Sequence, residues 1–275
     1  MPRIAFVGAG NMARSLIGGL VRTGLPAASI RASSPSEETR QLVGRSFGIA
    51  TFADNARCVE EAELVILATK PAKLPELQQE LAPLFRQYRP VLLSVAAGAQ
   101  LQQLGRWFGA SLPIIRCMPN TPALIGAGAS VLSANRHVSA PQRAMAQQVL
   151  DTCGLTRWVD DENLIDVVTG LSGSGPAYFF ALVEAMEQAA IAQGLPPDTA
   201  RALAAQTCLG AGRMLAESHE SATVLRQRVT SPRGTTQAAL DSFAADGLPS
   251  MVSRAMQAAT ERSRQLALQL EEPTP

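Results

Sequence analysis

The sequence predicts an α/β domain with a doubly wound parallel sheet, followed by an all-helical domain. Over residues 1–160, short apolar runs alternate with amphipathic stretches, as strands and helices do in βαβ units. Beyond residue 160 the strand-like runs stop, and long stretches rich in Ala, Leu and Gln follow. We therefore expect one domain over residues 1–160 and a second over residues 161–275.

The expected strands are short runs of β-branched and apolar residues, and they cover residues 4–7, 30–33, 64–69, 90–95, 114–118, 129–132 and 156–159. Amphipathic stretches between them predict helices over residues 36–46, 74–85, 101–108 and 141–151. Right-handed crossovers between such strands give a parallel sheet, and ligands bind such sheets at the carboxyl ends of the strands. The loops expected to hold a ligand are those after Val7, Ser33, Thr69, Val95 and Met118.

The second domain is expected to contain helices over residues 177–193, 197–218, 234–244 and 249–270. The first of these is apolar nearly all round and is interrupted mainly by Glu184 and Glu187. A helix of that kind needs a deeper core than a small helical domain makes by itself. We expect two subunits to interlock there, with burial inside its own domain as the alternative.

Composition narrows the class of protein. The 24 basic and 23 acidic residues nearly cancel, so nothing indicates binding to nucleic acid or to an anionic membrane. Without a long uninterrupted apolar run, a cytoplasmic enzyme acting on a small molecule is expected. The four cysteines lack paired spacing, so neither a metal site nor a disulfide framework is expected; they are Cys58, Cys117, Cys153 and Cys208.

The first thirteen residues contain a dinucleotide-binding motif. The strand-like run 4–7 leads directly into Gly8-Ala-Gly10-Asn-Met-Ala13, a G-x-G-x-x-A turn that opens a helix. Gly8 permits the tight turn, Gly10 lets the backbone approach a pyrophosphate, and Ala13 allows close packing of helix on strand. The helix N-terminus then binds the phosphates. A glycine-rich turn that merely packs is the alternative, but this position favours a Rossmann-type domain.

The end of the second strand favours NADPH over NADH. NAD-binding domains usually place a carboxylate there for the ribose 2′-hydroxyl. Here Arg31-Ala-Ser33-Ser34 provides hydroxyls, with Arg40 further along, and no acid. Hydroxyls and arginines suit a 2′-phosphate better, although NADH remains possible.

Several further segments together resemble a known enzyme family. They are Thr69-Lys70-Pro71, Ala96-Ala97-Gly98, Arg116-Cys-Met-Pro-Asn-Thr-Pro122, Leu171-Ser-Gly-Ser-Gly-Pro-Ala-Tyr178 and Val229-Thr-Ser-Pro-Arg-Gly-Thr-Thr236. In this order, over nearly the whole chain, they resemble the pyrroline-5-carboxylate reductases. The resemblance implies a Rossmann domain, a helical dimerisation domain and intertwined dimers that often assemble into larger rings. It also implies reduction of (S)-1-pyrroline-5-carboxylate to L-proline by NAD(P)H.

The resemblance assigns roles to individual residues of this chain. It implies that the cofactor contacts Gly8, Gly10, Asn11, Met12, Ser33, Ser34, Asn55, Ala68, Lys70, Ala97, Met118, Pro119 and Asn120. It implies that the substrate contacts Ser231, Gly234, Thr235 and Thr236. Thr236 would be the catalytic residue, with its hydroxyl beside the substrate nitrogen.

One residue departs from the family pattern. The family loop commonly reads Ser-Pro-Gly-Gly-Thr-Thr, whereas this chain has Arg233 at the first of those glycines. If the position needs a positive φ, Arg233 is strained by about 1 kcal/mol or more. We expect its side chain to face solvent; reaching into the site, where it would meet the substrate carboxylate, is the alternative.

Reduction of a cyclic imine suits a chain with few side chains that can donate a proton. The only lysines are Lys70 and Lys73, and the only histidines are His137 and His219. A cyclic imine is basic enough to be protonated near neutral pH, so its reduction needs no strong general acid, unlike reduction of a ketone. Backbone N–H groups of residues 234–236, at the start of a helix, would bind the substrate carboxylate.

Three other functions compete with this one. A β-hydroxyacid dehydrogenase expects a catalytic lysine on the first long helix of the second domain, and residues 170–193 contain none. A reductase of another cyclic imine, such as the six-membered homologue, differs by one ring carbon and stays open. A regulatory protein that binds NADPH without turnover also stays open, because of Arg233.

Overall fold

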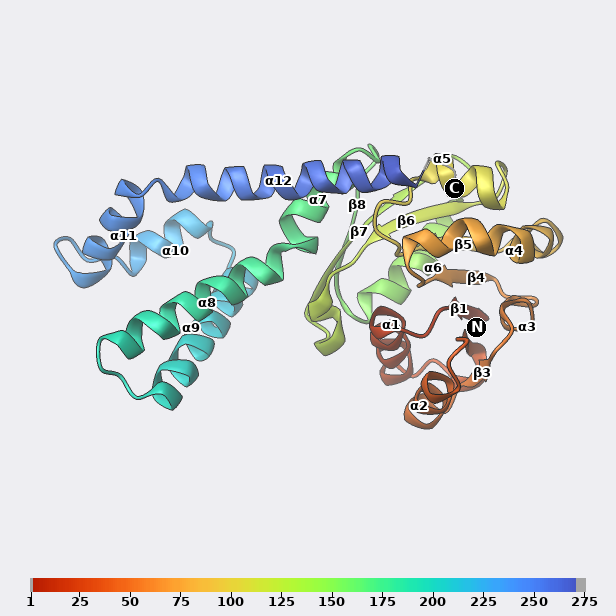
Figure 1. Ribbon diagram of the computed structural model, residues 1–275, viewed down its shortest axis with the longest axis horizontal. Helices are drawn as coiled ribbons and strands as arrows, with labels where there is room; N and C mark the ends of the chain where they lie inside the picture. Colours follow the sequence, from red (N-terminus) through yellow and green to blue (C-terminus); the bar gives the residue numbers. More distant parts are fainter. Residues whose placement is uncertain (1, 271–275) are drawn as a thin grey trace. The chain divides into compact units, whose positions relative to one another are not determined.

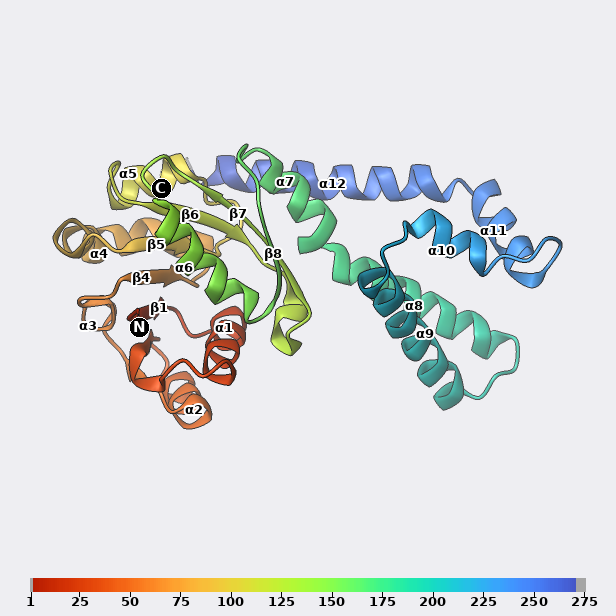
Figure 2. The same ribbon diagram turned by 180° about the vertical axis from the view of Figure 1, so that it is seen from behind.

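The computed structural model describes residues 2–270, which form two compact units (Figures 1 and 2). The first unit holds the chain up to Ser174 together with the residues from Ala258 onward. The second unit is Gly175–Gln257. These compact units do not test the expected boundary between two domains at residues 160 and 161, so that boundary stays a prediction.

The first unit is built on one sheet with the strand order β3-β2-β1-β4-β5-β6-β7-β8. Its strands are β1 (Ile4–Val7), β2 (Ile30–Ser33), β3 (Ala50–Phe52), β4 (Leu64–Leu67), β5 (Val91–Ser94), β6 (Ile114–Met118), β7 (Gly128–Ala134) and β8 (Gly154–Trp158). From β1 the chain first adds strands on one side and then, from β4, on the other. The strand order therefore reverses beside β1, where α/β sheets bind their ligands.

The sequence pattern predicts a parallel sheet, but the sheet is not parallel throughout. β7 runs antiparallel to β6, while β8 is parallel to β7. Only residues 119–127 join β6 to β7, and a parallel crossover needs a longer connection. The short strand β3 was not expected either, because a run of three residues shows little pattern; Ala50 is exposed, and Thr51 and Phe52 are partly buried.

Helices cover both faces of the sheet (Figures 1 and 2). They are α1 (Asn11–Arg22), α2 (Glu37–Phe47), α3 (Asn55–Val59), α4 (Leu74–Tyr88), α5 (Leu101–Phe108), α6 (Ala140–Asp151) and α7 (Leu164–Val168), with the short turns η1 (Ala27–Ser29), η2 (Pro71–Lys73), η3 (Thr121–Ile125) and η4 (Thr169–Gly173). Side chains alternate across a strand, so β1 serves two cores. Ile4 and Phe6 lie in one hydrophobic core, and Ala5 and Val7 lie in the other.

A buried ion cluster joins β6 to α7. The Arg116 side chain is 3% exposed; its Nη1 lies 3.0 Å from Glu162 Oε1 and its Nη2 lies 3.5 Å from Asp166 Oδ1. Glu162 Oε1 also accepts the Leu101 N–H at 2.8 Å, and Asp166 Oδ1 accepts the Ser263 hydroxyl at 2.7 Å. The cluster therefore holds the last part of α12 (Leu248–Gln269) to the sheet unit.

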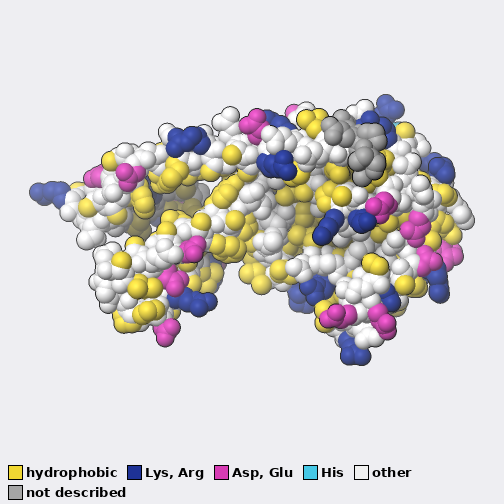
Figure 3. Space-filling model, in the orientation of Figure 1, with side chains coloured by type: hydrophobic (Ala, Val, Ile, Leu, Met, Phe, Trp, Pro, Cys, Tyr) yellow, Lys and Arg dark blue, Asp and Glu magenta, His cyan; other side chains and the backbone are white. Residues whose placement is uncertain are grey.

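The second unit is helical and consists of α8 (Gly175–Ala192), α9 (Pro197–Glu217), α10 (Ala222–Arg228), α11 (Thr235–Ala245) and the beginning of α12. Large apolar side chains lie on its surface, where Figure 3 shows hydrophobic groups between few charges. On α8, Phe179 and Phe180 are 59% and 69% exposed in the single chain. Among the described helices, none is both long and apolar enough to cross a membrane.

Candidate functional site

The turn after β1 has the geometry that the glycine motif predicts. Gly8 has φ +99°, and a Cβ there would lie 2.6 Å from the carbonyl oxygen of Ala68. Gly10 precedes α1 in extended conformation, and a Cβ there would meet nothing within 4 Å. Ala13 is fully buried against the core. Gly8 therefore lets the turn pack closely against the residue after β4. The open space at Gly10 leaves room for a ligand over the N-terminus of α1.

The polar groups of this turn fit an anionic dinucleotide. No side chain caps α1, and no acidic residue lies in its first turn, so its first N–H groups are available to a phosphate. The Thr69 hydroxyl at the end of β4 is buried and has no hydrogen-bond partner within the described structure. A water molecule or a bound ligand can supply the partner that such an atom lacks in the protein.

The loops after β2 and β3 bring Ser33 and Asn55 together. The fully buried Ser33 hydroxyl donates to Asn55 Oδ1 at 2.7 Å, and Asn55 Nδ2 donates to Glu80 Oε2 at 2.9 Å. Arg40 Nη1 donates to the carbonyl oxygens of Ser34 and Pro35 at 2.7 and 2.8 Å, and so clamps this loop. Glu80 lies on α4, outside any motif, and sequence analysis did not identify it.

The other cofactor residues predicted from the sequence lie at the carboxyl edge of the sheet. Lys70 and Ala97 are exposed in the loops that follow β4 and β5. Met118 ends β6, and Pro119 and Asn120 follow it. Since β1, β4, β5 and β6 are parallel neighbours, these loops and the Gly8 turn lie along one edge. Their contacts with a cofactor stay a prediction.

The predicted substrate residues lie together in the second unit. Gly234 caps α11 with its backbone alone, and Thr235 and Thr236 begin that helix. The Gly234 N–H donates to the Ser231 carbonyl at 3.0 Å, which closes the turn. Since no side chain caps α11 and its first turn is free of acids, its first N–H groups can bind a carboxylate. The arrangement supports an anion site, although the role of each residue stays a prediction.

Comparison with known proteins assigns the family. Residues 162–266 match the model of the pyrroline-5-carboxylate reductase dimerisation domain. Residues 3–98 match a family described as NADP oxidoreductase, coenzyme F420-dependent. A pyrroline-5-carboxylate reductase from Pseudomonas aeruginosa is 49% identical over 269 residues, covering 98% of each chain. This chain belongs to the pyrroline-5-carboxylate reductases.

Other pyrroline-5-carboxylate reductases also match this chain over nearly its full length. A pyrroline-5-carboxylate reductase from Glycine max is 37% identical and covers 96% of each chain. The solved structure of the Coxiella burnetii enzyme superposes with a TM-score of 0.93 at 36% identity, covering 97% of this chain and 98% of that one. A Plasmodium falciparum pyrroline carboxylate reductase structure with NADP bound, at 24% identity and a TM-score of 0.85, shares the fold.

These findings confirm the predicted family, the two-part fold and the class of enzyme, an NAD(P)H-dependent oxidoreductase. They also account for the apolar helix α8, because it lies within the dimerisation domain of the pyrroline-5-carboxylate reductases. The predicted interlocking of two subunits is thereby supported.

Arg233 in the family's loop has the conformation that a glycine favours. Its φ is +62°, so the condition for backbone strain is met, and its side chain is exposed in the single chain. Replacing Arg233 by Gly removes about 1–2 kcal/mol of strain and adds back about 0.5–1 kcal/mol of chain entropy. We expect Arg233→Gly to raise the free energy of unfolding by about 0.5 kcal/mol in urea titrations. Arg233→Ala, which keeps the Cβ, should give no gain, and a lower stability of the Gly variant would contradict the argument.

The three buried cysteines of this pyrroline-5-carboxylate reductase do not add reactive groups. Burial raises the pKa of the Cys58 thiol to about 12, and it also raises the pKa of Cys117 and Cys153. These thiols are therefore protonated at neutral pH and act as small apolar side chains. Within residues 2–270, no cluster of His, Cys, Asp and Glu could hold a metal ion.

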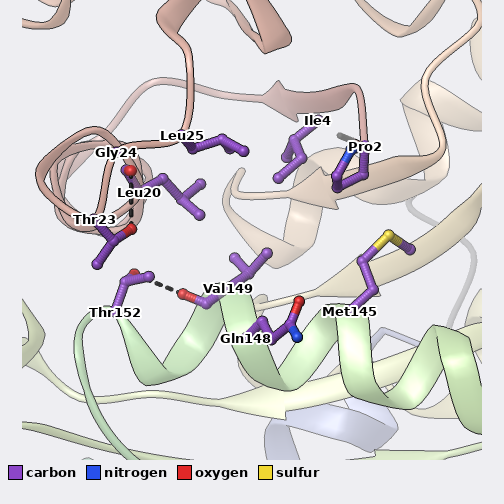
Figure 4. Close-up of a pocket in the computed structure, with 10 residues that line it drawn as sticks. All are labelled: Pro2, Ile4, Leu20, Thr23, Gly24, Leu25, Met145, Gln148, Val149 and Thr152. Atoms are coloured by element: carbon purple, nitrogen blue, oxygen red, sulfur yellow. Dashed lines mark hydrogen bonds between the residues drawn. The ribbon is translucent and has the colours of Figure 1, made fainter.

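One cavity lies away from the site. It has a volume of about 290 Å³ and lies beside the start of β1, the end of α1 and α6 (Figure 4). Its lining has no charged side chain and consists of Pro2, Ile4, Leu20, Thr23, Gly24, Leu25, Met145, Gln148, Val149 and Thr152. None of the predicted site residues lines it, and no cationic side chain there could pair with a phosphate.

Proposed function

We propose that this chain reduces (S)-1-pyrroline-5-carboxylate to L-proline, the last step of proline biosynthesis, with NADPH preferred and NADH possible. Its family assignment over nearly the full length carries the proposal, because its relatives bear this enzyme's name over the same length of chain. The uncapped helix at Gly234–Thr236 adds a physical reason, since the substrate has a carboxylate for its N–H groups to bind.

The cofactor is held, in this proposal, along the carboxyl edge of the sheet. The N–H groups of Asn11 and Met12 at the start of α1 bind the pyrophosphate, and the Gly8 turn keeps that space open. Ser34 and Asn55 bind the adenosine ribose and its phosphate, and the buried Ser33 orients Asn55 through its hydroxyl. When bound, the dinucleotide supplies a hydride. Lys70, Ala97 and the turn 118–120 border its nicotinamide end, with Ala68 at the end of β4.

The substrate is held by the loop at the start of α11. Backbone N–H groups of Thr235 and Thr236, with Ser231, bind the carboxylate. The Gly234 N–H was expected to join them, but it already donates to the Ser231 carbonyl and closes the turn. The Thr236 hydroxyl orients the ring nitrogen and relays a proton between that nitrogen and water. Because the imine is already basic, positioning rather than acid catalysis carries most of the rate enhancement.

The decisive experiment follows NADPH absorbance after addition of DL-pyrroline-5-carboxylate, beside its six-membered homologue. Rapid oxidation with the five-membered ring, and L-proline as product, supports the proposal. Faster turnover of the six-membered ring would instead identify a reductase of that imine. Binding of NADPH without turnover of either ring would indicate a regulatory protein and would overturn the proposal.

Thr236 gives a test of the mechanism. Thr236→Val removes the hydroxyl but keeps the shape and the backbone N–H, so we expect kcat/KM to fall about ten-fold, or about 1.4 kcal/mol. Thr236→Ser, which keeps a hydroxyl, should retain most of the activity. Steady-state kinetics of both variants check this, and an unchanged kcat/KM for Thr236→Val would remove the hydroxyl from the mechanism.

The assembly and its location belong to the same proposal. We propose a homodimer formed through residues 161–275, with residues 1–160 as the dinucleotide domain, and further assembly of dimers into a larger ring. The exposed apolar surface of α8 and the dimerisation match support the dimer. A small-molecule substrate and a near-neutral charge suit an enzyme of the cytoplasm.

A further inference from the structure

A π-helical turn lies at the end of the first unit, in the segment that leads into α8. In η4 (Thr169–Gly173), the Ser174 N–H donates at 2.8 Å to the carbonyl of Thr169, five residues earlier, instead of four as in an α-helix. Such turns are less stable than regular helix and occur frequently at functional sites. The contacts that hold η4 in place therefore point to its role.

The side chain of Asn120 holds η4 from the loop after β6. Its Nδ2 donates to the carbonyl oxygen of Ser172 at 3.0 Å, and its Oδ1 accepts the N–H of Ala129 at 2.8 Å. Asn120 is only 9% exposed, so both halves of its amide are used inside the protein. An Asn fits this place because it has both a donor and an acceptor, whereas Asp has only acceptors when ionised.

A second contact joins the same two segments. The Met118 side chain lies directly against Gly173 of η4, where a Cβ would collide with its methyl group. The turn 118–120 is therefore packed against η4 by Met118 and hydrogen-bonded to it by Asn120. Both contacts therefore act between the same two segments.

We propose that Asn120 is a positioning residue for hydride transfer: its amide fixes η4 against the turn 118–120, and so fixes the nicotinamide side of the site. This rests on the proposed function, which places that turn beside the nicotinamide. It differs from the direct cofactor contact expected for Asn120 from the sequence, since the amide oxygen and nitrogen each make a hydrogen bond within the protein, to Ala129 and Ser172. Small displacements of positioning groups lower rates strongly, even when binding is nearly unchanged.

Asn120→Asp tests the proposal. The new carboxylate still accepts the Ala129 N–H, but it faces the Ser172 carbonyl without a proton to donate. We expect kcat to fall about ten-fold, with Kd for NADPH, measured by fluorescence titration, within about three-fold of wild type. The emission maximum of the bound nicotinamide should shift, because its surroundings move.

Asn135→Asp is the matched control. Asn135 also clamps backbone with both ends of its amide: Oδ1 accepts the N–H groups of Ile114 and His137, and Nδ2 donates to the Leu112 carbonyl at 2.8 Å. It lies at the other end of β6, so its variant should lower Tm while leaving kcat and the emission of bound NADPH unchanged. If Asn120→Asp does not fold, Gly173→Ala disturbs the same contact from the other side, because its Cβ forces the flexible Met118 methyl group to move, and it should give a smaller loss of kcat in the same direction.

The kinetic and binding measurements distinguish the results that would overturn the proposal. A loss of kcat no larger than that of Asn135→Asp would reduce Asn120 to a structural residue and overturn the proposal. A ten-fold weaker Kd with unchanged kcat would show direct cofactor binding and would also overturn it. If wild type turns over no cyclic imine, the proposed function fails, while Kd and the emission of bound NADPH still test whether Asn120 positions the turn.

Discussion

Gly8→Ala is expected to weaken NADPH binding about 100-fold and to lower the stability of the protein by about 3 kcal/mol. A Cβ at Gly8 would lie 2.6 Å from the oxygen and 2.9 Å from the carbon of the Ala68 carbonyl, which is backbone at the end of a buried strand. The neighbour cannot move aside cheaply, and the φ of +99° adds strain for any residue with a Cβ. Urea titration and fluorescence titration with NADPH measure the two effects.

Gly10→Ala separates binding from folding. A Cβ there meets nothing within 4 Å, and the backbone has φ −73°, so the unliganded protein should keep its stability. The methyl group would nevertheless occupy space that the proposed pyrophosphate needs, so NADPH should bind more weakly. Equal stability of the Gly8 and Gly10 variants would contradict the reading of Gly8 as a turn that excludes any side chain.

Arg116→Met is expected to lower the free energy of unfolding by about 3–5 kcal/mol, because it leaves two carboxylates without their cation. The Asp166 side chain is 7% exposed and that of Glu162 is 25% exposed, so water cannot fully replace the guanidinium. Chemical denaturation measures the loss. Arg213→Met is the matched control: Arg213 and Glu217 form an ion pair whose side chains are 68% and 65% exposed, and its loss should cost at most about 0.5 kcal/mol.

The triple variant Arg116→Met, Glu162→Gln, Asp166→Asn tests whether the unpaired carboxylates cause the loss of stability in Arg116→Met. It removes the uncompensated charges together with the cation, so it should recover a large part of the stability lost in the single variant. A triple variant as unstable as Arg116→Met would mean that packing of the arginine, and not charge, dominates.

Local sequence patterns predicted most of the fold, because they depend on neighbours along the chain. β1, β2 and β6 and the helix α5 have the expected bounds, since apolar runs and their ends are visible in the sequence. The direction of β7 was predicted wrongly, although the short link after Met118 contained the signal. The short helices α7 and α10 were missed, because five to seven residues show little periodicity.

The parts of the candidate site that depend on distant residues could not be read from the sequence. The glycine turn was predictable, since its geometry is set within a few residues. The pairing of Asn55 with Glu80, and of Asn120 with Ser172, joins residues 25 and 52 positions apart. No local pattern marks such partners; only the order of the strands brings them together.

The second unit has almost no interior within one chain. Across the described Gly175–Gln257, the buried residues are Gly175, Ala200 and Ala204, none larger than alanine, while phenylalanines, leucines and methionines lie at the surface. An isolated chain would gain too little from covering its apolar area to offset the entropy of ordering these helices. Folding of this unit is therefore coupled to association, and the stability of the protein is a function of its concentration.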